Sequence, residues 1–131
     1  MAAGRYSFTI EQGTTVDFRI DYKDSNNQPV DLTNYQSRMQ IRNLPGSADV
    51  ICSLSSSLLS DGTGLNMTPT SGSTTLPKSS GSIGIFISAA TSSLFSFLEA
   101  YYDLEIVSGS SNPYVVRILE GKIKLSQEVT R

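Results

Sequence analysis

Apolar and polar residues alternate along most of the chain with a period of two. Between residues 16 and 22, the apolar side chains of Val16, Phe18, Ile20 and Tyr22 alternate with charged ones. Successive side chains of a β-strand point to opposite faces, so this pattern predicts a strand with one face on a core and one face in water. A helix would scatter the same apolar residues around its axis.

The same alternation predicts further strands on both sides of this one. It covers residues 6–10, 36–42, 50–54, 83–87, 101–106, 114–119 and 122–129, and residues 65–67 form a shorter candidate. Asp, Asn and Pro predict a tight turn over residues 24–29. Gly, Pro, Asn and Ser indicate further turns at residues 45–46, 108–113 and 120–121. In the last strand, Ile123 and Leu125 are expected to face the core.

Two segments depart from the alternation. Residues 91–98 predict a short helix, because Thr91 is suited to cap its N-terminus and Leu94, Phe95, Phe97 and Leu98 give it an apolar side. Such a short helix needs tertiary packing to persist. Residues 70–82 are rich in Ser, Thr and Gly and predict a surface loop.

Seven or eight short strands joined by turns predict an all-β protein with antiparallel pairing. The expected architecture is an immunoglobulin-like antiparallel β-sandwich with one short helical connection, formed by a single domain over residues 1–131. A small barrel is the alternative. Tyr102, near the start of a late strand, matches the position of the tyrosine corner of such sandwiches.

Composition narrows the chemistry that the chain can perform. The 131 residues include no His, no Trp and one Cys. Without His, the Ser–His and Cys–His nucleophile pairs are excluded, and one Cys cannot supply a Cys/His zinc site or an internal disulfide. Cys52 alternates with Val50 and Leu54, which predicts a core position. We therefore expect a protein that binds or builds, with no catalytic residue and no cofactor.

Net charge and hydropathy limit the kinds of partner that the chain is expected to bind. A net charge of −2 and a sequence pI near 5.0 argue against nucleic acid as a partner. The sequence contains no apolar run of about 18 residues, so no membrane span is expected. No apolar leader of a secretory signal stands at the start, and the glycosylation sequon at Asn66 is attributed to chance.

The acidic residues do not match known site patterns. Residues from Asp24 onward begin like a calcium loop, but Pro29 stands where the loop needs Gly and Tyr35 where it needs Glu. Asp103 and Glu105 lie two apart on one strand, on the face that the alternation directs to solvent. They are not expected to form the facing carboxylates of a glycosidase. No metal site is expected.

The glycine and basic residues do not form a known nucleotide- or phosphate-binding motif. Residues 62–64 lack the third glycine of a dinucleotide fingerprint, and Lys78 lacks the glycines that cradle phosphate. Arg38 and Arg42 flank Met39 and Ile41, so they either bind a partner's carboxylates or cover an outward strand face.

Two stretches of the sequence carry a resemblance to known proteins. The first is QPVDLTNYQSRMQIR at residues 28–42. The second combines ISAATSSL at 87–94, AYYDLEI at 100–106 and VRILEGKIKLSQEVTR at 116–131. Together they are similar to the immunoglobulin-like domain at the N-terminus of siphophage upper baseplate proteins. The similarity spans most of the chain, and residues 70–82 depart from it as an insertion.

The resemblance implies a non-enzymatic structural protein of a tailed bacteriophage virion. Such a protein would be made in the bacterial host cytoplasm and act in the virion as a multi-copy tail, baseplate or neck adaptor. Its partners would be other virion structural proteins in a symmetric assembly, and the family has no catalytic residue to transfer. Two alternatives stay open: a capsid decoration or cement protein, and a host- or carbohydrate-binding module.

The contact surfaces of such an adaptor are expected at sheet edges, where unpaired backbone groups can accept a strand from a neighbour. Residues 6–10 and 122–129 are the candidate edge strands. Residues 70–82 either order against a partner or form a solvated insertion.

Overall fold

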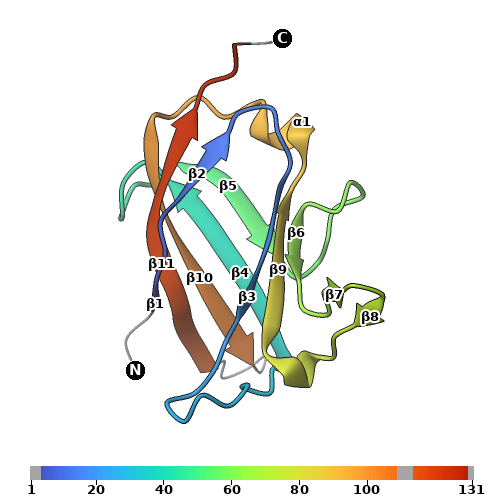
Figure 1. Cartoon of the computed structure of the whole chain (residues 1–131). Helices are drawn as coiled ribbons and strands as arrows, with labels where there is room; N and C mark the ends of the chain where they lie inside the picture. The colour runs from blue at the N-terminus through green and yellow to red at the C-terminus, as the bar shows by residue number, and fades with distance from the viewer. Residues whose placement is uncertain (1–3, 109–113, 130–131) are drawn as a thin grey trace.

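The computed structural model describes residues 4–108 and 114–129 and confirms the predicted fold class (Figure 1). The chain is an immunoglobulin-like β-sandwich with one short helical connection. The predicted turn at 108–113 lies, apart from Ser108, outside the described residues. The strands are β1 (Gly4–Arg5), β2 (Phe8–Glu11), β3 (Val16–Asp21), β4 (Tyr35–Arg42), β5 (Val50–Ser55), β6 (Gly64–Asn66), β7 (Thr70–Ser71), β8 (Thr74–Thr75), β9 (Ser82–Ile87), β10 (Glu99–Ser108) and β11 (Tyr114–Ser126).

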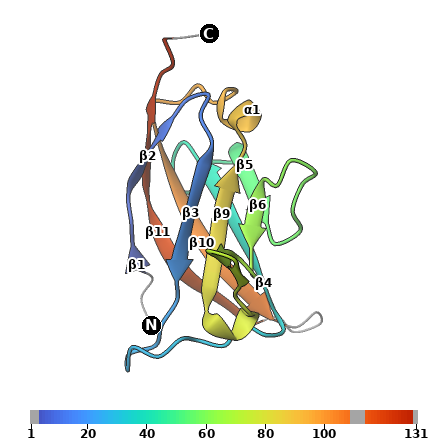
Figure 2. The ribbon, with the colours of Figure 1, turned by 45° about the vertical axis from the view of Figure 1, so that its right-hand side comes forward.

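Two sheets form the layers of the sandwich (Figure 2). The larger has six strands in the order β1-β11-β10-β4-β5, with β2 also beside β11, and the smaller has the order β3-β9-β6. In immunoglobulin terms, β4, β10 and β11 correspond to strands C, F and G, and β3, β9 and β6 to B, E and D. The pairs are antiparallel except that β1 and β2 run parallel to β11.

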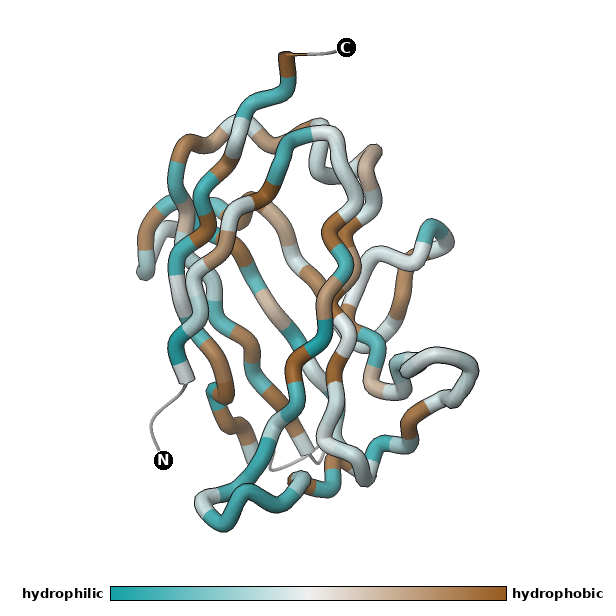
Figure 3. The backbone as a smooth tube through the Cα atoms, viewed as in Figure 1, coloured by the Kyte–Doolittle hydropathy of each residue, from teal (hydrophilic) through white to brown (hydrophobic). Residues whose placement is uncertain are grey.

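The core lies between the two sheets and follows the predicted alternation. Hydrophobic and hydrophilic positions alternate along the strands in Figure 3. In β4, Met39 and Ile41 are buried, and in β10, Leu104 and Ile106 are buried. Ile123 and Leu125 of β11 are buried as predicted; the other buried apolar residues are Ile10, Leu32, Leu54, Leu65, Met67, Ile83, Ile85, Ile87, Phe95, Phe97, Ala100, Tyr102 and Ile118.

The turn predicted at residues 120–121 is wrong, because β11 runs without interruption through it. The register changes where Leu104 faces Leu119 but Glu105 faces Arg117, so β11 carries one extra residue there, a β-bulge. Gly121 does not form a turn; it allows the backbone of Tyr6 to approach β11 closely. A Cβ at Gly121 would lie 2.0 Å from the Tyr6 carbonyl oxygen, so only glycine lets the N-terminal strand pass.

The N-terminal strand is held to β11 on both sides of a short break. The Tyr6 amide donates to the Glu120 carbonyl (3.0 Å), and the Ser7 hydroxyl accepts the Lys122 amide (3.2 Å). The Tyr102 hydroxyl donates to the Tyr6 carbonyl (2.5 Å). The predicted tyrosine corner is therefore wrong, because this hydroxyl bonds to a distant strand and not to backbone just upstream of itself.

The helix forms earlier and is shorter than predicted. Helix α1 spans Ala89–Ser92, and Ser88 caps it by accepting the Thr91 amide at 3.2 Å. Residues 93–98 are not helical: Phe95 and Phe97 are buried, whereas Leu94 and Leu98 are 82% and 75% exposed. The buried phenylalanines are two residues apart, as in extended chain, and the predicted apolar helix face does not form.

The predicted loop at residues 70–82 is partly ordered. Strands β7 and β8 form a hairpin, and a 3-10 turn, η1 (Lys78–Ser80), follows it. The Lys78 carbonyl accepts the Leu32 amide at 3.0 Å, and Gly81 has φ +72° and packs against the backbone of Tyr22 and Val30. The end of segment 70–82 therefore packs against the sandwich through backbone contacts.

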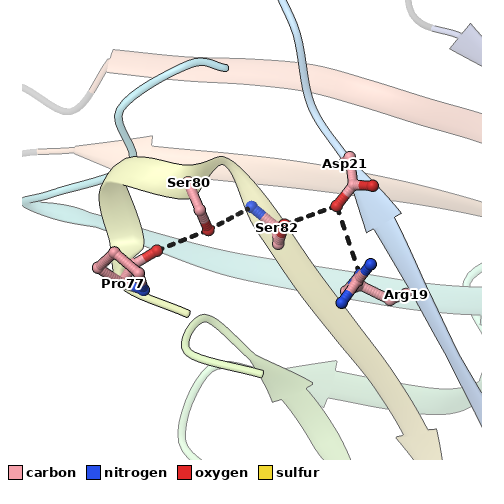
Figure 4. Close-up of polar contacts among 5 residues, drawn as sticks. All are labelled: Arg19, Asp21, Pro77, Ser80 and Ser82. Atoms are coloured by element: carbon pink, nitrogen blue, oxygen red, sulfur yellow. Dashed lines mark hydrogen bonds and ion pairs between the residues drawn. The ribbon is translucent and has the colours of Figure 1, made fainter. Parts of the chain in front are cut away.

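Polar side chains fasten the end of this segment to β3 (Figure 4). The Ser82 hydroxyl donates to the Asp21 carboxylate (2.6 Å), which also lies 3.5 Å from the Arg19 Nε. The Ser80 hydroxyl donates to the Pro77 carbonyl (2.7 Å) and accepts the Ser82 amide (3.3 Å). Hydroxyls that suggest a mobile loop thus form local hydrogen bonds that fix the turn.

The turn predicted at residues 24–29 is confirmed, and Asp side chains stabilise it and the next corner. The Asp24 carboxylate accepts the amides of Asn26 (2.9 Å) and Gln28 (3.0 Å). The Asp31 carboxylate accepts the Thr33 amide (2.9 Å) and hydroxyl (2.5 Å). These carboxylates replace backbone partners where the chain turns into β4.

Candidate functional site

The described residues offer no cluster of metal-ligating side chains. Within 4–108 and 114–129, no group of three or more His, Cys, Asp or Glu side chains lies close enough to hold a metal ion. Cys52 is half-buried beside the core, and burial raises the pKa of its thiol, which disfavours the reactive thiolate. In the same ranges, no helix has the length and hydrophobicity needed to cross a bilayer.

One of the two predicted edge strands, the N-terminal one, lies at a sheet edge, and the other does not. The C-terminal strand is not an edge, because β11 has β10 on one side and β1 and β2 on the other. The N-terminal strand is at one end of the larger sheet and β5 at the other. β11 becomes an inner strand because the N-terminal strand pairs with it in parallel, a contact that local sequence patterns do not contain.

Charged side chains gather on the outer face of the six-stranded sheet. Six of the chain's ten Lys and Arg residues lie on this outer sheet face, against five of its twelve carboxylates. The cations are Arg5, Arg38, Arg42, Arg117, Lys122 and Lys124, and the carboxylates are Glu11, Glu99, Asp103, Glu105 and Glu120. The face is thus positive in a chain whose net charge is −2.

A hollow of about 500 Å³ lies on this face, across β1, β11, β10 and β4 and beside the turn at Pro45 and Gly46. We call it the basic hollow, after the four cations that line it: Arg5, Arg42, Arg117 and Lys122. Asp103 and Glu120 are its carboxylates, and Ser7, Gln40 and Tyr101 complete its polar lining.

Ion pairs between strands occupy some of these charges. The Arg38 Nε lies 2.8 Å from the Glu105 carboxylate, and the Arg117 Nε lies 3.3 Å from that of Asp103. Asp103 and Glu105 do share a strand face, as predicted, and each is paired with an arginine. Lys122 lies 3.8 Å from Glu99, with its Nζ 5.5 Å from the centre of the Tyr101 ring.

Two cations of the basic hollow have no acidic partner in the described parts of the chain. The Arg42 guanidinium donates to the Ser47 carbonyl and to the Gln40 side-chain oxygen (2.8 Å). These neutral acceptors orient the Arg42 side chain but leave its charge uncompensated. Arg5, on the exposed edge strand, forms no ion pair with a described residue.

The carboxylates of the chain should titrate in a defined order. Burial raises the pKa of Asp103, although Arg117 opposes the shift, whereas hydrogen bonds from the Thr33 hydroxyl and amide lower the pKa of Asp31. We expect a carboxyl-detected NMR titration to show Asp103 protonating at a higher pH than Asp31. Asp31→Asn provides the assignment control, and Asp103 titrating at or below Asp31 would contradict the described packing.

The two shifts act on stability with opposite signs. The lowered pKa of Asp31 means that its contribution is present above its unfolded pKa, about 3.9, and is lost as the pH falls through the folded value. The raised pKa of Asp103 favours the folded state while that carboxyl is protonated, and this contribution is lost as the pH rises through its folded pKa.

The basic hollow combines residues that sequence reasoning did not bring together. The sequence suggests Arg42 as a ligand of a partner's carboxylate, but it does not point to Arg5, Arg117 and Lys122, because their proximity depends on the strand order and on the bulge in β11. The excess of cations in the lining suits the binding of an anionic group. Comparison with known proteins adds no identity, since no protein family and no curated protein matches the chain.

Proposed function

We propose that the chain is a non-enzymatic structural protein of a tailed bacteriophage virion, a multi-copy adaptor in the tail, baseplate or neck. The observation that carries the proposal is the similarity of residues 28–42, 87–94, 100–106 and 116–131 to the immunoglobulin-like domain of siphophage upper baseplate proteins. Those residues form β4, α1, β10 and β11, together with the corner that Asp31 caps. The similarity thus covers the central strands of the larger sheet.

The surfaces of the domain are consistent with an adaptor. A repeating assembly needs more than one contact surface on each copy. The domain has open sheet edges at the N-terminal strand and at β5, and a charged outer sheet face between them. The described residues offer no metal cluster, and the chain has no His to activate a nucleophile.

The experiment is to locate the chain in particles made by the phage or prophage that encodes it. We expect mass spectrometry of purified virions to detect the chain in several copies per particle, and antibodies against the recombinant domain to label the tail or its end in electron micrographs. Deleting the gene should leave incomplete tails, and wild-type chain supplied from a plasmid should restore them.

Other outcomes would refute this assignment. Labelling of the capsid shell would identify the decoration or cement alternative. Binding of the isolated domain to host cells or glycans, without a defect in tail assembly, would identify the host-binding module. Normal, infectious particles that contain none of the chain would exclude every structural role.

A further inference from the structure

We propose that the basic hollow binds an acidic, extended segment of a partner protein, with Arg42 and Arg5 receiving its carboxylates. The inference deepens the proposed function and rests on it for the kind of partner, a neighbouring structural protein. The hollow lies between the N-terminal edge strand and the turn at Pro45 and Gly46, so a segment bound there would cross four strands.

Charge is the first reason. Four cations line the hollow against two carboxylates, while the whole chain is acidic. Arg117 and Lys122 already have carboxylate partners, whereas Arg42 and Arg5 have no ion pair with a described residue. Glu120, opposite Arg5 in the strand register, is the one lining carboxylate without such a pair, so a net charge of one cation is left uncompensated. An acidic partner would be steered to this face and repelled by the rest of the surface. Arginine suits that role because its planar fork can bind a carboxylate through two hydrogen bonds.

The mixed lining is the second reason, and it favours a peptide over a nucleic acid. A peptide brings backbone N–H donors as well as carboxylates. The carboxylates of Asp103 and Glu120 and the side-chain oxygen of Gln40 can accept such donors. A phosphate backbone offers acceptors and no N–H donors, so Asp103 and Glu120 would find no hydrogen-bond partner in it.

The position of Tyr101 argues against an anionic sugar. A sugar-binding surface needs an open aromatic face, and Tyr101 is the half-buried aromatic residue of the hollow. The Lys122 ammonium lies over its ring, 5.5 Å from the centre. The other aromatic lining residue, Tyr102, is 4% exposed and has no free face. The hollow's volume of about 500 Å³ falls within the range of about 300–1,000 Å³ typical of ligand sites.

The test is an NMR titration of the isotope-labelled full chain with a short capped peptide that alternates Glu and Ser. A matched peptide with Gln in place of Glu is the control for charge. We expect the Glu peptide to shift the amide resonances of Gln40, Arg42, Tyr101 and Lys122, and the Gln peptide to shift none of them. Raising the ionic strength from about 0.02 M to about 0.3 M should weaken the binding, because salt screens exposed charges.

Variants assign the effect to the hollow. Arg42→Gln should weaken the binding by about threefold, as expected for one exposed ion pair, and R5Q combined with R42Q should weaken it further. Lys23→Gln removes the same charge from an exposed residue outside the hollow and should leave the affinity unchanged. Far-UV circular dichroism of each variant checks that the fold is kept.

The inference would be overturned by equal binding of both peptides, by shifts outside the hollow, or by wild-type affinity in the R5Q/R42Q variant. An oligouronate that displaces the peptide at lower concentration would assign the hollow to a sugar instead. Failure of peptide binding with the chain still present in purified tails would reject this inference alone. Absence of the chain from particles would reject the proposed function, whatever the peptide result.

Discussion

Replacing Ile123 by Ala should lower the free energy of unfolding by about 2–5 kcal/mol, the usual cost of truncating a buried aliphatic side chain. Ile123 is fully buried, and in the larger sheet it lies between Ala100 of β10 and Phe8 of β2. Truncation removes apolar contacts and leaves a cavity, because the paired strands cannot close around it. Urea denaturation followed by circular dichroism measures the change.

A matched control tests whether the loss of stability comes from burial of the side chain or from the substitution of an aliphatic residue by Ala as such. Leu94 is another aliphatic residue, but it is 82% exposed beyond α1. Leu94→Ala should change the free energy of unfolding by no more than about 0.5 kcal/mol. Equal costs for the two substitutions would mean that the Ile123 side chain does not lie in the core between the two sheets as described.

Gly121→Ala should detach the N-terminal strand from β11 and destabilise the domain by about 1–3 kcal/mol, as overpacking does. A Cβ at this position would lie 2.0 Å from the Tyr6 carbonyl oxygen, 2.7 Å from its carbon and 3.2 Å from the Tyr102 ring. The first two atoms belong to backbone, so relief requires the strand to move. That movement would also break the bond from the Tyr102 hydroxyl to Tyr6.

Hydrogen exchange locates the damage. In the Gly121→Ala variant, the Tyr6 amide should exchange much faster, while the amides of β3 and β9 stay protected. Gly4→Ala is the control, because a Cβ there meets only ordinary contacts, the nearest at 3.6 Å, and its backbone is not left-handed. If both variants kept full protection at Tyr6, the close crossing at Gly121 would be wrong.

The strands could be predicted from the sequence because one face of each packs on the core, fully buried or, in β3, half-buried. In β3, β4, β9 and β10 the alternation of apolar and polar residues follows directly from the pleat, so the period identifies both the strand and its inward side. Short-range capping was also predictable in part. Asp24 and Asp31 stabilise the turns at which they stand, as expected of Asp in a turn.

What could not be predicted depends on contacts between distant residues. Gly121 has the local features of a turn, and only the passage of Tyr6 explains why a strand needs glycine there. Ser88 and Thr91 are both residues that favour the N-cap position of a helix. Ser88 is the N-cap of α1, because the helix must end early enough for the chain to become extended and bury Phe95 and Phe97. The basic hollow gathers residues from both ends of the chain, so its charge is visible only once the strand order is known.

The parallel pairing of β1 and β2 with β11 has a mechanical consequence. Because the two chain ends leave these neighbouring strands in opposite directions, a pull between them slides one strand along the other (Figure 1). Their hydrogen bonds then carry the load together, in shear, instead of opening one at a time as in an unzipping hairpin. The N-terminal strand is therefore a clamp: a domain linked into a filament through both ends would resist tension through the contacts that Gly121 and Tyr102 make possible.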